Sequence, residues 1–102
     1  MLTATTILCG CEPKAKKTSK DLEGITEKYI NDMDNAQSKD EASRIHKEYK
    51  ERKEFEVNKL SDEEKEEYLK NRSWEERQHQ EKLYQESVDA RERAKKRLRE
   101  NQ

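Results

Sequence analysis

Large aliphatic side chains are scarce in this chain of 102 residues. Seven leucines, four isoleucines, two valines and one phenylalanine make up only about 14% of the sequence, below the roughly 20% at which a folded core becomes hard to build. Because 46% of the residues are charged, we expect thin packing and no thick globular core. A catalytic site built on buried carboxylates needs an apolar pocket, so no catalytic residues and no enzyme activity are expected.

Helix-breaking residues are also rare, with two glycines and one proline. Glutamate, lysine, arginine and glutamine dominate, and all four have good helix propensity. We therefore predict an all-α chain, a helical hairpin or a coiled-coil-like three-helix array. The 23 basic and 24 acidic residues give a formal net charge of −1, which offers no case for a nucleic-acid partner, and the C-terminal third has too few aromatic residues to stack bases.

The two cysteines, Cys9 and Cys11, lie close together near the start of the chain. A disulfide between residues two apart would be a strained ring. Neither His46 nor His79 has a metal-ligand spacing to them. Glu76 and His79 have the spacing of one half of a carboxylate di-metal site, but the second half is missing from the sequence. We therefore expect no metal and no cofactor.

The composition changes abruptly at Cys11. Residues 2–11 read LTATTILCGC and carry no charge, whereas residues 12–21 read EPKAKKTSKD. Such a change is typical of a cleaved hydrophobic segment followed by a polar mature start. The four residues LCGC, from Leu8 to Cys11, resemble the lipobox of bacterial lipoproteins, in which an aliphatic residue, a small residue and Gly or Ala precede the cysteine.

This resemblance implies that residues 1–10 are a signal segment, truncated at its start, and that Cys11 is the lipidation site. In the family this cysteine carries a diacylglycerol and a further acyl chain, and two or more chains give a stable membrane anchor. The family often has Asp after the cysteine in proteins held at the inner membrane. Glu12 in that place favours the outer membrane, with the polar part facing the periplasm.

The functional hypothesis is a lipid-anchored helical module that binds another envelope protein or the cell wall, with no small-molecule substrate. Small lipoproteins of this kind serve in envelope maintenance, in secretion or conjugation machinery including entry exclusion, and in phage lysis. The alternative is a cytoplasmic coiled-coil adaptor without a lipid anchor. In that alternative the N-terminal segment is a disordered tail with two free thiols.

Capping residues divide the rest of the chain. We expect a flexible tether over residues 11–18 and a helical region over residues 19–102, with Thr18 or Ser19 as the first N-cap. Leucine, isoleucine and tyrosine then recur at steps of three and four, which predicts an amphipathic first helix. Three further helix starts are indicated where a serine is followed three residues later by glutamate, at Ser38, Ser61 and Ser73.

Trp74 begins the last predicted segment, whose apolar face we assign to Trp74, Tyr84, Val88, Ala94 and Leu98. Trp74 either fills the seam between helices or contacts a partner. We expect it to fill the seam, because aromatic area is most of what this chain has to bury. Residues 89–102 carry a net charge of +3 and residues 54–67 one of −5, so the basic end either grips an anionic partner or simply suits a helix C-terminus.

Overall fold

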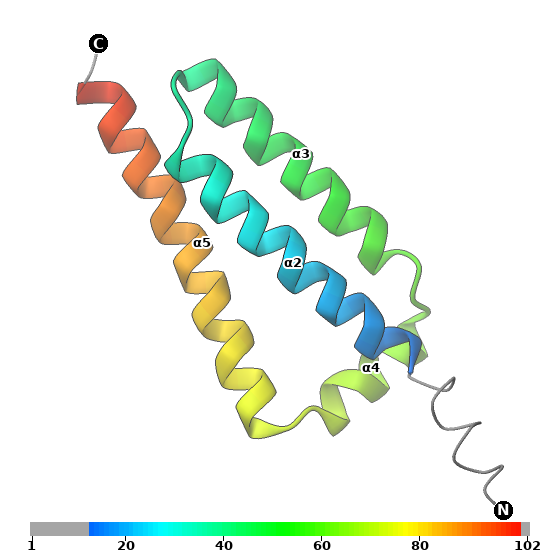
Figure 1. Ribbon diagram of the computed structural model, residues 1–102. Helices are drawn as coiled ribbons and strands as arrows, with labels where there is room; N and C mark the ends of the chain where they lie inside the picture. The colour runs from blue at the N-terminus through cyan, green and yellow to red at the C-terminus, as the bar shows by residue number, and fades with distance from the viewer. Residues whose placement is uncertain (1–12, 101–102) are drawn as a thin grey trace, which may run out of the picture.

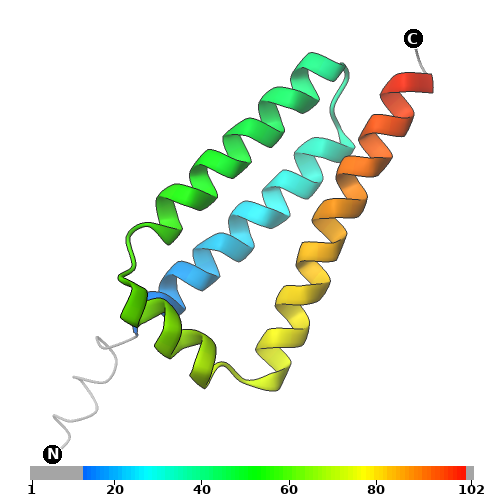
Figure 2. The ribbon, with the colours of Figure 1, turned by 180° about the vertical axis from the view of Figure 1, so that it is seen from behind.

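The computed structural model describes residues 13–100, and these form four helices and no strand. The elements are α2 (Lys14–Asp34), α3 (Lys39–Val57), α4 (Asp62–Asn71) and α5 (Trp74–Glu100). The three long helices lie side by side with α2 in the middle, and the short α4 crosses one end of the array (Figure 1). The view from behind shows the same order (Figure 2). The prediction of an all-α, three-helix array is confirmed.

Helix α2 begins at Lys14, five residues before Ser19. Pro13 occupies the N-cap position with φ −56°, and its carbonyl accepts hydrogen bonds from the amides of Lys16 and Lys17. Proline suits a helix start because its φ is already helical and it has no N–H to satisfy. The predicted cap at Thr18 or Ser19 is therefore wrong, and so is the tether from residue 14 onward. Residues 11–12 of the tether lie outside the described residues.

The serine caps that start the later helices are confirmed. Ser61 Oγ accepts the amide of Glu64 at 3.1 Å, and the Glu64 carboxylate accepts the amide of Ser61 at 2.8 Å. The hydrogen bond from the Ser61 amide to the carboxylate is the main cause that lowers the pKa of Glu64. Ser38 and Ser73 each accept the amide three residues on at 3.1 Å. Each side chain satisfies an amide that the first helical turn leaves unpaired.

The core is thin and lies mainly between α2 and α5. Its best-buried members are Met33 of α2, which is 1% exposed, and Ala90 of α5, which is 0% exposed. Neither α3 nor α4 contains a fully buried side chain. The cluster consists of Tyr29, Met33, Ala90, Ala94 and Leu98, with Ile30, Ala42, Ile45 and Tyr49 packed against it.

The inward face of α5 differs from the predicted face. Trp74, Tyr84 and Val88 are 70%, 60% and 37% exposed, so the expectation that Trp74 fills the helix seam is wrong. The buried residues recur at steps of three and four and are Leu83, Ser87, Ala90, Ala94 and Leu98. Small residues of α5 fit where it lies against α2, because the larger side chains of Tyr29 and Met33 already fill the same cluster. Only Ala94 and Leu98 were predicted correctly.

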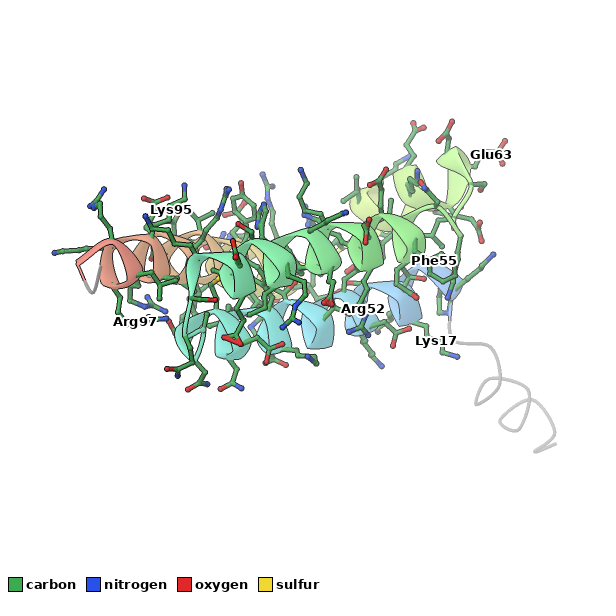
Figure 3. All side chains as sticks on the ribbon, turned by 90° about the horizontal axis from the view of Figure 1, so that it is seen from above. Lys17, Arg52, Phe55, Glu63, Lys95 and Arg97 are labelled. Atoms are coloured by element: carbon green, nitrogen blue, oxygen red, sulfur yellow. The ribbon has the colours of Figure 1, made fainter. Side chains whose placement is uncertain are left out.

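Part of the basic C-terminal segment ties α5 to the end of α2. Arg97 donates from Nη2 to the carbonyl oxygens of Met33 and Ala36, both at 3.0 Å. Arg93 makes two hydrogen bonds to the carboxylate of Asp34, at 3.1 and 3.0 Å. Arg97 thus adds a donor to carbonyls at the C-terminal end of α2, where helical hydrogen bonding ends. Figure 3 shows Arg97 and Lys95 pointing to opposite sides of the array.

Candidate functional site: a groove between α3 and α5

The space between α3 and α5 contains two hollows, and α2 forms their floor. The first has a volume of about 370 Å³ and lies toward α4. Its floor includes Leu22 and Thr26, and its walls include Val57 of α3 and Tyr84 of α5. Leu69 of α4 closes one end. Leu69 and Tyr84 are 57% and 60% exposed, so this hollow presents uncovered apolar surface.

The second hollow lies toward the C-terminal end of α5 and has a volume of about 420 Å³. Met33 of α2 gives it an apolar floor, and Ala42 of α3 and Leu98 of α5 add apolar residues to its walls. Figure 1 shows that α3 runs antiparallel to α2 and that α5 runs parallel to it. Since α3 and α5 both extend along α2, the two hollows follow one another along the same space. We call them together the α3–α5 groove. In Figure 3, α2 lies on one side of both α3 and α5, which is the position expected of the groove floor.

The charged residues that line the groove are almost all cations. Glu23 is its single acidic residue, although acidic side chains outnumber basic ones in the chain as a whole. A concave surface lined by charges of one sign concentrates the potential and attracts the opposite charge. The cations are Lys39, Lys53, Lys65, Arg72, Arg91, Lys95 and Arg99.

Three of the four cations that line the second hollow are not ion-paired within residues 13–100. Lys39, Arg91 and Arg99 form no ion pair with any side chain that the structure describes. By contrast, Lys95 lies 3.5 Å from Glu92 on its own helix, and Lys53 lies 5.7 Å from the ring centroid of Tyr49. In the first hollow, Lys53 and Arg72 also form no ion pair with a described side chain, but Glu23 is part of the same lining. Among the described residues, the second hollow has four cations and no acidic residue, so positive charge is concentrated there.

His46 also lines the second hollow, and its Nδ1 lies 3.0 Å from Tyr29 Oη. Burial, together with the charges of Arg91, Lys50 and Lys95, lowers the pKa of His46 below its ordinary value. Burial also raises the pKa of Tyr29. Both side chains are therefore neutral near pH 7, and the positive charge of the groove comes from lysine and arginine.

A polar network holds α4 across the end of the array. Tyr68 Oη lies 2.9 Å from Ser19 Oγ of α2 and 3.0 Å from the carboxylate of Glu76. Gln80 of α5 donates to both Ser19 and Tyr68, at 2.9 and 2.8 Å, and accepts from Arg72 at 2.7 Å. The bond from Tyr68 is the main cause of a lowered pKa at Glu76. Within residues 13–100, no acceptor reaches the buried Nε of Arg72.

The fold does not place the candidate site residues from the sequence, which are Trp74, Glu76 and His79, in one site. Cys11 lies outside the described residues. Trp74 is the first residue of α5 and is not part of the groove lining. Glu76 bonds to Tyr68, whereas His79 Nε2 lies 3.5 Å from Glu23, so the two do not form half of a metal site. Across residues 13–100, no three side chains of the metal-binding types converge.

The sequence did contain one signal for the groove. Arg91, Lys95 and Arg99 recur at steps of four, so a helix places them on one face. Sequence reasoning treated them only as a net charge at the C-terminus. That Lys39 of α3 lines the same hollow as these residues depends on the packing of α3 beside α5.

Comparisons with protein-family models, with curated proteins and with solved structures found no match to this chain. Over residues 13–100, the helices are too short or too polar to cross a membrane.

Proposed function

We propose that this chain is a lipid-anchored binding module of the bacterial envelope. Cys11 carries the lipid, and the helical array holds another envelope protein or the cell wall. The observation that carries the binding role is the open α3–α5 groove. Aliphatic residues are few in this chain, yet Leu69 and Tyr84 are exposed along the groove. In addition, α3 contains no fully buried side chain.

The shape of the groove favours a protein partner. In a four-helix bundle each helix packs its apolar face against two neighbours around one core. Here α2, α3 and α5 supply three long helices that lie side by side (Figure 1). The groove lies between α3 and α5, where a fourth helix would complete the arrangement. A surface of this kind suits an added helix better than a small enclosed substrate.

The anchor is supported by the LCGC sequence and by the position of the first helix. Only Glu12 and Pro13 separate Cys11 from the start of α2 at Lys14. A lipid on Cys11 therefore holds the array close to the bilayer, and Glu12 favours the outer membrane with the array in the periplasm. The process served is envelope maintenance, secretion or conjugation, or phage lysis.

Membrane fractionation with labelled palmitate tests the anchor. The gene is expressed with its natural upstream region, and we expect the protein to sediment with membranes and to incorporate the label. Cys11→Ser removes the acceptor thiol, so this variant is expected in the soluble fraction without label. Cys9→Ser is the matched control and is expected to behave as the parent does. A parent protein that stays soluble with a free Cys11 thiol would favour the cytoplasmic adaptor instead.

A further inference from the structure

We propose that the α3–α5 groove binds an acidic amphipathic helix of a partner protein, which completes a four-helix bundle. This inference rests on the proposed binding role, and it is independent of the lipid anchor. It names the chemistry of the partner, which must combine an apolar stripe with acidic flanks.

The dimensions of the groove fit one helix. Its α3 wall extends from Lys39 to Val57, the full 19 residues of that helix, which at 1.5 Å per residue is about 28 Å. Tyr68 and Leu69 of α4 line the first hollow at one end. A partner helix of roughly 18 to 20 residues therefore fills the groove from α4 to the far end of α5.

The floor and the walls of the groove are complementary to different residues of the partner helix. The α2 floor offers Leu22 in the first hollow and Met33 in the second, and Leu98 of the α5 wall lines the second hollow too. The inward stripe of the partner is therefore apolar. The walls offer Arg91 and Arg99 on α5 and Lys39 on α3, none of which is ion-paired. Carboxylates along both flanks of the partner helix pair with these cations, whereas a basic helix would be repelled.

A second copy of this chain is a poorer occupant. A two-fold dimer brings the same surface of each chain into contact with itself. If two α3–α5 grooves faced each other, the cations Arg91, Arg99 and Lys39 of one chain would lie near those of the other and repel them. Glu23 is the single acidic residue of the lining that could offset this repulsion. The acidic segment at residues 62–67 is already part of α4, which packs against α2 in the same chain.

Binding of two designed helical peptides tests the proposal. The full-length chain carries Cys9→Ser and Cys11→Ser, so that it stays unlipidated. Both peptides have about 20 residues and the same leucine stripe, and they differ only in glutamate or lysine at the flanking positions. Isothermal titration should show the glutamate peptide binding tighter by about tenfold or more. Its affinity should fall as salt rises from about 50 to about 500 mM, because screening weakens the pairing.

Charge reversal locates the binding surface. The groove variant combines Lys39→Glu, Arg91→Glu and Arg99→Glu, and it should lose about tenfold in affinity for the glutamate peptide and gain affinity for the lysine peptide. The matched control combines Lys47→Glu, Lys82→Glu and Lys96→Glu, which makes the same change at exposed positions of the same two helices outside the groove. Circular dichroism checks that both variants keep the helicity of the parent.

Four outcomes would overturn the proposal. They are equal affinity for the two peptides, no binding of either, an equal loss from the two triple variants, or self-association of the parent that the groove variant abolishes. If the groove variant loses helicity, the proposal is still tested by the comparison of the two peptides and by the salt series, because both use the parent chain. Because every measurement uses the unlipidated chain, failure here leaves the fractionation test of the anchor unaffected.

Discussion

Tyr29 of α2 and His46 of α3 share a hydrogen bond of 3.0 Å between Oη and Nδ1, and their ring centroids lie 5.8 Å apart. The charges that act on His46 come from Lys50 on its own helix and from Arg91 and Lys95 on α5. Burial and these charges lower the pKa of His46 in the folded chain. The unfolded chain therefore takes up this proton first as the pH falls.

Stability should decrease on acidification through this histidine. The contribution is fully present above the unfolded pKa of about 6.5, and it is lost as the pH falls from there toward the lower folded pKa. Guanidinium unfolding at pH 7.5 and at pH 5 measures the difference. His46→Gln should show a smaller loss than the parent. His79→Gln removes the other, exposed histidine and is the control; an identical loss in the parent and in His46→Gln would contradict the assignment.

Tyr68→Phe should destabilise the chain by about 1–3 kcal/mol. The variant removes the hydroxyl that links α4 to Ser19 and Gln80 and leaves those polar groups without one partner. Tyr84→Phe removes a hydroxyl from a residue that is 60% exposed and should change stability little. Urea unfolding measures both variants. A Tyr68→Phe midpoint equal to that of the parent would mean that the network does not hold α4.

Gly24→Ala should stabilise the chain by about 1 kcal/mol, because alanine has the higher helix propensity. Gly24 lies inside α2, and no atom lies within 4 Å of the position that a Cβ would take. The thermal midpoint should therefore rise. A lower midpoint would show that the open space beside Gly24 is occupied in solution, for example by a neighbouring copy.

Met33→Ala should cost about 2–5 kcal/mol, since it truncates the largest fully buried side chain of the core. Because the core is thin, a loss of that size should remove most of the helicity seen by circular dichroism at 37 °C. Leu69→Ala is the control, because Leu69 is 57% exposed. Retention of a sharp, high-temperature transition in Met33→Ala would show that an oligomer supplies stability that the single chain lacks.

Trp74→Ala should leave helicity unchanged and alter stability by less than about 0.5 kcal/mol, because the side chain is 70% exposed. Trp74 stays a candidate partner contact, and loss of partner capture in this variant would support that role. Trp74 is the only tryptophan of the chain, so its fluorescence reports on this site alone. Quenching by acrylamide should approach that of free tryptophan; strong protection would contradict the exposed position.

Local rules predicted the helix boundaries where a side chain bonds to a nearby amide. Ser38, Ser61 and Ser73 do so within three residues, so tertiary packing is not needed to recognise them. The start of α2 was missed because Ser19 looked like a cap. Its hydroxyl instead bonds to Tyr68 and Gln80, which lie 49 and 61 residues away along the chain.

The face of α5 was missed for a related reason. Trp74, Tyr84 and Val88 carry the strongest apolar signal in that segment, but Ser87 and Ala90 are the buried residues. Small side chains give weak signals in a sequence, although they allow two helices to approach closely. The groove could be predicted only in part, because the charge spacing on α5 is visible whereas the position of Lys39 beside it is not.

The central position of α2 sets how the array would respond to mechanical load. With a lipid on Cys11 and a partner held between α3 and α5, a pulling force enters at Lys14 and runs along the axis of α2. The load then shears α2 lengthwise past both neighbours, so contacts along the whole helix resist at once instead of separating one by one. The two bonds from Arg97 to the last carbonyls of α2 lie at the far end and would break together with the rest.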